Sequence, residues 1–285
     1  DDVESRGLGD VYKRQEMDKI TFDEKRIAEG YMNRPWLHKK VIERFVSDCE
    51  VTSNFRNGLD VGCGAGLSTK ALHLICDRVT GTDISEQMIQ VCKEEYKDNK
   101  AYTFYRAKAE ETKEPAEKYD IVTAAGMVNW VDRDLFLENM GHALQDQGIL
   151  LIYDFWIIDK MQGNDAYTNW YHEEYLKRFP KPPRNENTWK QSELPDYFHI
   201  KNQITYELFY DFSMEQFIDF MMIQSNVNTK IENGEVSEVE ARDWFKNSLS
   251  PVFENRKKTL YFTGYSWYLY KSAVQRYSLC PTKAP

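Results

Sequence analysis

Long apolar runs, cysteine pairs and metal-ligand clusters are all missing from this 285-residue chain. It has no run of about 18 apolar residues, so the sequence predicts no membrane-spanning helix. The five cysteines include no CxxC pair and no Cys/His spacing typical of a metal site. Their odd number favours reduced thiols, and no charged-then-apolar leader is visible. We therefore expect a cytoplasmic protein without a bound metal.

Basic residues are fewer than acidic residues in this chain. The chain has 46 acidic residues against 37 Lys and Arg, which gives a formal net charge of −9. A protein that binds nucleic acid neutralises phosphates with concentrated Lys and Arg. We therefore expect neither nucleic acid nor a membrane among its partners.

The most informative segment is GLDVGCGAG, at positions 58–66. It predicts a short apolar strand, a turn with glycine at every second position, and a helix that starts at Leu67. Glycine permits a tight turn and lets a ligand come close to the backbone. A strand, a glycine turn and a helix N-terminus together form a nucleotide-binding corner. The GxGxG spacing differs from the dinucleotide fingerprint GxGxxG, so we interpret it as a site for a nucleoside without phosphates.

An acidic residue after the next predicted strand supports this interpretation. The segment VTGTD, at 79–83, predicts a strand that ends in Asp83, 17 residues after Gly66. One crossover helix fits that distance, and a carboxylate there can accept hydrogen bonds from both ribose hydroxyls. The alternative is that the glycine turn is purely structural and that Asp83 only caps a helix.

Strand-like and helix-like segments alternate through the first half of the chain. The expected strands cover 57–61, 78–83, 101–106, 119–125 and 148–154, and the expected helices cover 67–76, 85–97 and 133–146. This alternation predicts an α/β fold with a doubly wound, mostly parallel sheet. Aromatic residues dominate the second half of the chain, since 27 of the 40 lie within 151–285. There we expect helices over 165–178, 213–225 and 236–250, and strands over 204–212 and 258–271.

The first 15 residues need a separate interpretation. The segment SRGLGDVYKRQ, at 5–15, can be back-translated into a sequencing adapter of the transposase type. We interpret residues 1–15 as a non-native tail and the gene as metagenomic. The alternative is a genuine terminal segment.

Several segments together resemble the class I S-adenosylmethionine-dependent methyltransferases. The glycine turn and GTDIS at 81–85 resemble the first two motifs of that family, and AKAE at 107–110 and YDIVTAA at 119–125 fit later ones. AAGMVNWVD, at 124–132, is similar to the AAxxxHWxD signature of the trans-aconitate-methyltransferase-like branch. YMNRP, at 31–35, resembles the YxxxRP segment of that branch. The resemblance covers roughly residues 22–155.

The resemblance implies a seven-stranded, Rossmann-like sheet with an antiparallel closing strand and a helical lid. It divides the chain into N-terminal helices (16–50), a cofactor-binding core (51–155), a substrate lid (156–200) and strands and helices that complete the sheet (201–285). It also implies S-adenosylmethionine as the cofactor, S-adenosylhomocysteine as the product and a small-molecule acceptor as the partner of a monomer or homodimer. The implied cofactor-binding residues are Tyr31, Arg34, Asp60, Gly62, Cys63, Gly64, Gly66, Asp83, Ile84, Met88, Ala109, Glu110 and Ala125.

These residues have separate expected roles. The three glycines admit the cofactor, Asp60 steadies the turn near the methionine amino group, and Asp83 holds the ribose. Tyr31 and Arg34 approach the methionine carboxylate, Cys63 fills space as a small buried residue, and Ala125 faces the sulfonium. The adenine is flanked by Ile84, Met88, Ala109 and Glu110.

Asn129 and Trp130 are the candidate catalytic residues. Methyl transfer from a sulfonium needs mainly a nucleophile held about 3 Å from the methyl group. A general base is required only when the nucleophile arrives protonated. Where relatives often have His, this chain has Asn129, which can orient an acceptor but cannot take its proton. We therefore expect an acceptor that is already ionised, such as a carboxylate, or a base elsewhere in the chain.

The aromatic segment after Phe155 offers candidates for the acceptor pocket. Trp156, Trp170 and Tyr171 are the expected substrate-lining residues, with core packing as the alternative. His172 could serve as a base, although a surface histidine is the simpler interpretation. A basic cluster could hold an acidic substrate or could be a solvated helix end; it comprises Lys177, Arg178, Lys181 and Arg184.

Two other classes of protein remain open. A non-catalytic protein could keep the S-adenosylmethionine or S-adenosylhomocysteine pocket and lack a working acceptor site, as Gly126 and Asn129 allow. An NAD-dependent oxidoreductase is the other, and the glycine spacing is against it. Tyr96 and Lys100 form a YxxxK pair, but they precede the third strand, so we interpret them as surface residues.

Overall fold

The structure is a computed structural model, and it describes residues 25–111, 114–181 and 189–272. The proposed non-native tail at 1–15 therefore lies outside the described residues. So do the start of the 16–50 segment and Arg184 of the basic cluster.

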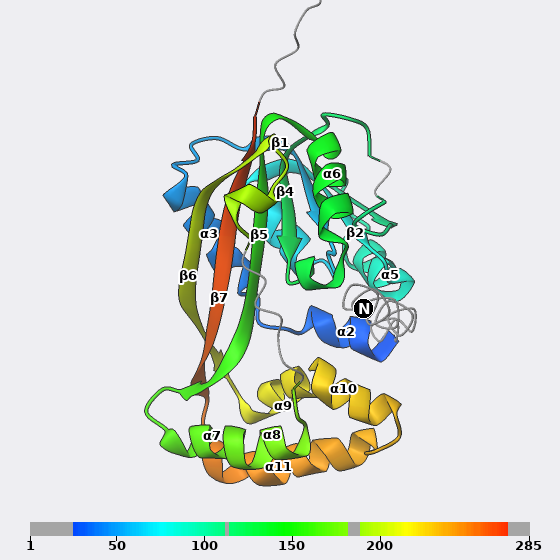
Figure 1. The fold of residues 1–285 in the computed structure, drawn as a ribbon. Coiled ribbons are helices and arrows are strands. Elements are labelled where there is room, and N and C mark those ends of the chain that lie inside the picture. The colour runs from blue at the N-terminus through cyan, green and yellow to red at the C-terminus, as the bar shows by residue number, and fades with distance from the viewer. Residues whose placement is uncertain (1–24, 112–113, 182–188, 273–285) are drawn as a thin grey trace, which may run out of the picture.

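A seven-stranded sheet runs through the molecule in the order β3-β2-β1-β4-β5-β7-β6 (Figure 1). Its strands are β1 (Phe55–Val61), β2 (Cys76–Asp83), β3 (Tyr102–Arg106), β4 (Tyr119–Ala125), β5 (Leu144–Met161), β6 (Phe198–Phe212) and β7 (Lys258–Lys271). Strands β1 to β5 pair in parallel, and β7 is antiparallel to both of its neighbours. The predicted α/β class, the mostly parallel sheet and its antiparallel closing strand are confirmed.

The three strands β5, β6 and β7 are much longer than the others. β5 starts four residues before the expected 148 and continues to Met161, and β6 starts at Phe198 rather than at 204. They pair along almost their whole length, so β7 satisfies the backbone of β5 and β6 far beyond the parallel part of the sheet. The alternating burial of β6 shows one packed and one exposed face.

Helices cover both faces of the parallel strands. Apolar side chains of α3 (His38–Asp48) and α4 (Leu67–Leu72) pack on one face, in a cluster with β1, β2, β4 and β5. α6 (Arg133–Ala143) packs on the other face, and α5 (Glu86–Glu95) lies beside β3. A short 3-10 helix, η1 (Val128–Trp130), follows β4. Both crossover faces are thus buried, as an apolar parallel sheet requires.

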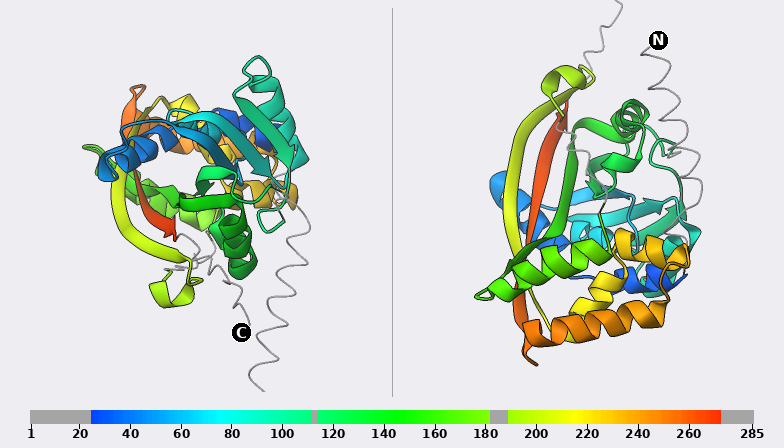
Figure 2. Two further views of the ribbon diagram at one scale, coloured as in Figure 1. Left: turned by 90° about the horizontal axis from the view of Figure 1, so that it is seen from above. Right: turned by 60° about the horizontal axis from the view of Figure 1, so that its bottom comes forward.

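A separate layer of helices lies across the end of the long strands (Figures 1 and 2). It consists of α7 (Asp165–Trp170), the π-helix η2 (Tyr171–Tyr175), α8 (Leu176–Arg178), α9 (Met214–Met222), α10 (Ser225–Glu232) and α11 (Glu238–Phe253). The expected helix over 165–178 is formed by the first three. The expected helix over 213–225 stops at Met222, and Ser225 starts a second one. A 3-10 turn, η3 (Gln191–Glu193), precedes β6.

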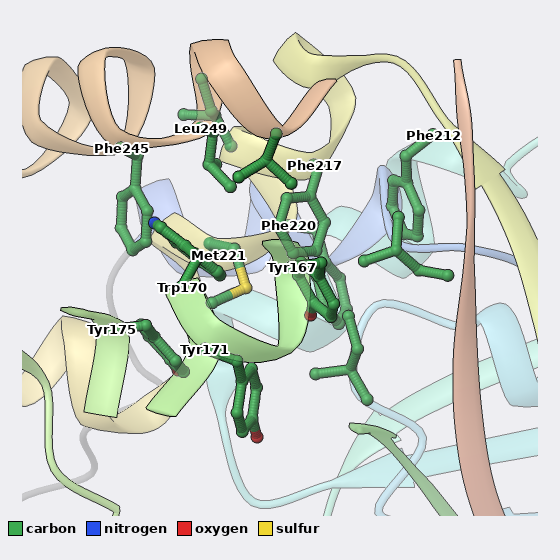
Figure 3. Packing of buried hydrophobic residues seen from close by; sticks show 14 of the residues in the cluster. Tyr167, Trp170, Tyr171, Tyr175, Phe212, Phe217, Phe220, Met221, Phe245 and Leu249 are labelled. Carbon is green, nitrogen blue, oxygen red and sulfur yellow. The ribbon is translucent and has the colours of Figure 1, made fainter. Parts of the chain in front are cut away.

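Aromatic packing holds this layer together, as Figure 3 shows. Trp170 is stacked on Tyr175 with ring centroids 5.5 Å apart, and Phe179 is stacked on Phe245 of α11 at 5.4 Å. The layer is therefore built jointly by the segments 165–179 and 212–253, which are distant in the sequence.

The helix α2 (Lys25–Met32) lies between the parallel sheet and the helical layer (Figure 1). Its residues Ile27 and Ala28 are buried with Ala65, Met88 and Ile223. Because β5 leads directly into the helical layer and β1 and β4 run parallel to it, their carboxyl ends face this layer. Ligands of open α/β sheets bind at that edge. Among the described residues, no helix is both long and apolar enough to cross a bilayer.

Candidate functional site

The glycine turn after β1 has a backbone that only glycine adopts easily. Gly62, Gly64 and Gly66 have φ of 67°, 52° and 88°, which lie in the left-handed region. A Cβ on Gly62 would lie 2.8 Å from Met127, and one on Gly66 would lie 2.9 Å from the ring of Tyr96. At Gly64 the nearest atom is Tyr31 Cδ1 at 3.7 Å. The turn is therefore tightly packed at Gly62 and Gly66, whereas at Gly64 an added Cβ would meet only Tyr31, at ordinary contact distance.

Asp60 lies buried behind the turn, and its carboxylate accepts hydrogen bonds from three hydroxyl groups. Ser68 and Thr69 of α4 donate to its Oδ2 at 2.6 and 2.7 Å, and Thr123 of β4 donates to its Oδ1 at 2.7 Å. Burial raises the pKa of this carboxyl to about 6, although the three hydrogen bonds oppose the rise. The carboxylate joins β1, α4 and β4, which supports the expected role in steadying the turn.

Asp83 ends β2 and faces the turn from the neighbouring strand. Its Oδ2 accepts from the Gly64 amide at 2.8 Å, and its Oδ1 accepts from the Ser85 amide at 2.9 Å. Next to it, Ile84 is 41% exposed, whereas Met88 is buried. The structure thus brings the two predicted acids and the glycines to one corner. The ribose and adenine contacts stay predictions.

Cys63 and the β3 loop complete the corner. The Cys63 side chain is buried, and burial raises the pKa of its thiol, which suits a space-filling residue rather than a nucleophile. Ala109 is also buried, and Glu110 accepts a hydrogen bond from the Asp132 amide at 3.0 Å. The β3 loop is therefore tied to the segment that carries Asn129 and Trp130.

Asn129 and Trp130 lie on η1, just beyond Ala125 at the end of β4. Both are exposed, and Trp130 exposes 55% of its surface. Gly126 has a φ of 66°, and a Cβ there would lie 3.1 Å from the Asp154 carboxylate of β5. The loop after β4 is therefore close to both β1, through Met127, and β5.

Tyr31 and Arg34 lie opposite the turn. The guanidinium of Arg34 is 4.6 Å from the ring centroid of Tyr31 and 5.6 Å from that of Phe220 in α9. No carboxylate within the described residues lies at ion-pair distance from Arg34. By contrast, Arg26 pairs with Glu238 and Arg178 pairs with Glu240. This cation between the sheet edge and the helical layer fits the expected contact with a carboxylate.

The predicted acceptor residues do not lie together. Trp156 is partly buried on β5 and meets the Tyr265 ring at 6.3 Å. Trp170 is 2% exposed inside the helical layer, where its Nε1 donates to Ser248 at 3.0 Å. Tyr171 is buried at the border of the same cluster (Figure 3) and accepts from Lys181 at 2.8 Å. This placement favours the packing alternative for Trp170 and leaves Trp156 as the candidate next to the carboxyl edge.

The charged residues of the lid segment have partners of their own. His172 is half exposed and bonds Asp159 at 2.6 Å. Lys177 pairs with Glu173, and Arg178 pairs with Glu240 of α11 at 2.7 Å. Lys177 and Arg178 thus support the solvated-helix alternative, whereas Lys181 contacts the rings of Tyr171 and Tyr175.

Sequence reasoning missed His38 and Tyr153. His38 is the first residue of α3, and its Nδ1 lies 2.9 Å from the hydroxyl of Tyr153 near the end of β5. Its ring also meets Phe155 at 4.9 Å. Burial, together with the charge of Arg34, lowers the pKa of His38 to about 3. No motif signals this pair, because its two members are 115 residues apart.

Tyr96 also differs from the expectation that it is a plain surface residue. Its ring is stacked on Tyr102 at 4.5 Å, and its hydroxyl donates to the Gly66 carbonyl at 3.4 Å. Lys100 is exposed, as expected.

Comparisons with known proteins agree with the geometry of this corner. Residues 59–152 match the family described as "Methyltransferase domain". A Dictyostelium discoideum protein described as a methyltransferase is 25% identical over 205 residues, which cover 65% of this chain and 76% of that protein. The ubiquinone biosynthesis O-methyltransferase of Pelagibacter ubique is 32% identical over 95 residues, which cover 33% of this chain and 40% of that enzyme.

The fold has a counterpart among solved structures. A protein from Anaeromyxobacter dehalogenans described as a type II methyltransferase superposes with a TM-score of 0.61 at 19% identity, covering 82% of this chain and 95% of that one. At this identity the likeness concerns the fold alone. The chain thus has a methyltransferase fold, and its residues 59–152, which include the glycine turn, Asp83 and Asn129, are similar in sequence to methyltransferase domains.

Proposed function

We propose that this chain is an S-adenosylmethionine-dependent methyltransferase that acts on a small-molecule acceptor. The observation that carries the proposal is the corner at the carboxyl edge, where three left-handed glycines, Asp60 and Asp83 meet in front of α2. Only Tyr31 lies within 4 Å of a Cβ placed at Gly64, and this loose packing fits a cofactor that must approach the backbone closely. Bound S-adenosylmethionine supplies a methyl group on a positively charged sulfur.

The residues of this corner have distinct proposed tasks. Asp83 lies where a carboxylate can receive the ribose hydroxyls, while Ile84, Met88, Ala109 and Glu110 border the adenine. Asp60 stays behind the turn and orients the first turn of α4 through Ser68 and Thr69. Tyr31 and Arg34 cover the methionine side, and Ala125 ends β4 beside the reacting group.

The acceptor is proposed to enter between η1 and the extended β5. Asn129 and Trp130 are exposed there, and Trp156 follows on β5. An amide such as Asn129 can orient an oxygen by hydrogen bonds but cannot remove its proton. We therefore favour an acceptor that binds already ionised, such as a carboxylate. An oxygen acceptor is also in keeping with the O-methyltransferases that the chain resembles.

The division of the chain is proposed in a modified form. Residues 51–155 hold the cofactor, and residues 201–285 complete the sheet. The lid function of 156–200 is shared, because α7 and α8 pack with α9 and α11 in one layer. This layer closes the space in front of the carboxyl edge.

Calorimetry with S-adenosylhomocysteine and with NAD tests the cofactor assignment. We expect binding of S-adenosylhomocysteine, loss of that binding in Asp83→Ala, and no binding of NAD. NAD binding, or failure to bind S-adenosylhomocysteine, would sink the proposal. A protein that binds the product but transfers no methyl group to any acceptor would instead be the non-catalytic alternative, which Gly126 and Asn129 keep open.

A further inference from the structure

The pair of His38 and Tyr153 lies at the edge of the sheet where ligands are expected. Tyr153 is the partner of Ala125 in the register of β4 and β5, and its carbonyl accepts from the Gly126 amide at 2.8 Å. His38 therefore projects toward the same strand ends that carry the proposed reaction centre.

The hydrogen bond within the pair sets the tautomer of His38. The Tyr153 side chain is fully buried, and within the described residues His38 Nδ1 is the sole hydrogen-bond partner of its hydroxyl. Burial raises the pKa of Tyr153, so the phenol keeps its proton. A buried hydroxyl directs its hydrogen at an acceptor, so Tyr153 donates to Nδ1. The proton of the neutral imidazole then lies on Nε2.

The Nε2–H group of His38 has no partner in the described part of the chain. No hydrogen bond to it occurs there, and it is not enclosed as a buried, unsatisfied atom. His38 is only partly buried, so this donor reaches accessible space. It is a fixed donor because the other nitrogen is held by Tyr153.

Arg34 adds a second donor to the same place. Its charge is near enough to His38 to help lower the pKa of the imidazole. Arg34 itself rests on the rings of Tyr31 and Phe220 without a carboxylate partner among the described residues. Arg34 lies against the ring of Phe220 and His38 against the ring of Phe155, and both of these rings meet Phe262 of β7. A permanent cation and a neutral N–H donor thus border one aromatic cluster. Charge-assisted hydrogen bonds to a carboxylate would satisfy both.

We propose that Arg34 and the Nε2–H of His38 together bind a carboxylate group, with Tyr153 as the positioning residue that orients the imidazole. The inference rests on the proposed methyltransferase function for the source of the carboxylate. That source is either the methionine moiety of the cofactor or the acceptor, since both present the same chemistry at this edge.

Nitrogen NMR of the full chain, with His38 signals assigned through His38→Gln, tests the tautomer and the ligand. We expect the Nε2–H tautomer in the free wild type and its loss in Tyr153→Phe. 5′-Methylthioadenosine, which has no carboxylate, is compared with S-adenosylhomocysteine. Sodium benzoate is compared with benzamide, both with and without S-adenosylhomocysteine. If the nitrogen signal of His38 shifts with S-adenosylhomocysteine but not with 5′-methylthioadenosine, the ligand is the methionine carboxylate. If it shifts with benzoate but not with benzamide, the ligand is the carboxylate of the acceptor.

Affinity measurements on variants complete the test. Arg34→Met and His38→Gln should each weaken the carboxylate-dependent binding, by about tenfold for the arginine. Binding of 5′-methylthioadenosine should stay unchanged, and exposed His199→Gln is the matched control. The inference would be overturned if the free wild type had the Nδ1–H tautomer. It would also be overturned if His38 responded equally to S-adenosylhomocysteine and 5′-methylthioadenosine and equally to benzoate and benzamide. If the wild type binds neither nucleoside but still distinguishes benzoate from benzamide, the proposed function fails and the carboxylate site stands.

Discussion

Single residues in the glycine turn combine an unusual backbone with a lack of space. Gly66 has a φ of 88°, and a methyl group there would lie 2.9 Å from Tyr96 and 3.1 Å from the Cys92 sulfur. Gly163 has a φ of 64° but no atom within 4 Å of the same position. Substitution at Gly163 therefore measures the free-energy cost of the left-handed backbone alone. Substitution at Gly66 adds the cost of steric overlap with Tyr96 and Cys92.

Gly66→Ala and Gly163→Ala should have different effects on the free energy of unfolding. The left-handed backbone alone costs about 1–2 kcal/mol, which is the expected loss for Gly163→Ala. Gly66→Ala adds overpacking of about 1–3 kcal/mol and should also weaken S-adenosylhomocysteine binding. Denaturant unfolding and calorimetry measure both quantities. Equal losses for the two variants would show that the turn has room to relax.

The raised pKa of Asp60 should make the stability of the folded chain depend on pH. Its pKa rises from 3.8 to about 6 in the folded chain, so folding favours the protonated form. The wild type should therefore lose stability relative to Asp60→Asn as the pH rises through that interval, by about 3 kcal/mol in all. Unfolding of both proteins at a series of pH values gives this difference. A constant difference would mean that Asp60 is ionised as easily in the folded chain as in the unfolded one.

Among the secondary-structure elements, α5 follows Asp83 and packs against the glycine turn. Residues Met88, Cys92 and Tyr96 succeed one another at intervals of four and so lie on one face of the helix. Met88 packs with Ala65, the Cys92 thiol donates to the Gly64 carbonyl at 3.2 Å, and Tyr96 donates to the Gly66 carbonyl. The helix thereby supports the glycine turn through three of its side chains.

Tyr96→Phe tests this support. The variant keeps the ring stack and loses one weak hydrogen bond, so S-adenosylhomocysteine affinity should fall by roughly twofold to fivefold. Tyr102→Phe is the matched control, because Tyr102 stacks on the same ring but makes no hydrogen bond to the turn. Titration calorimetry on both variants measures the change. Identical affinities for the two would show that Tyr96 only packs.

The sequence was most informative where function and backbone geometry are encoded locally. The glycine turn, Asp83 and the alternation of strands and helices each leave a short-range pattern, and the structure has them where they were predicted. The length of β5 and β6 left no such pattern, because it depends on pairing with β7, whose partner residues are between 46 (Phe212 and Lys258) and 121 (Ile149 and Tyr270) positions away in the sequence. For the same reason, no pattern separated Trp170, which is buried by α11, from Trp156. The His38–Tyr153 contact could not be predicted from the sequence either, because its two residues are 115 positions apart and meet only in the folded chain.

At the scale of the whole molecule, the helical layer is a second core joined to the sheet by the long strands. Trp170 is at its centre, in contact with rings from α7, η2, α9 and α11. Trp170→Ala should therefore cost about 3–5 kcal/mol of stability, whereas Trp130→Ala, at an exposed site, should cost much less. Thermal unfolding of the two variants compares them. Preserved stability in Trp170→Ala would mean that Trp170 is free to serve the acceptor site after all.

The whole molecule is proposed to move a methyl group from S-adenosylmethionine to a small molecule. The most direct test is to incubate the full chain with methyl-labelled S-adenosylmethionine and a pool of small metabolites, with Asp83→Ala as the control. We expect one or a few labelled products of low mass and no label with the variant. The product should carry the methyl group on an oxygen that is ionised at neutral pH in the unmethylated acceptor. A protein that binds S-adenosylhomocysteine but leaves every metabolite unlabelled would contradict the proposed activity.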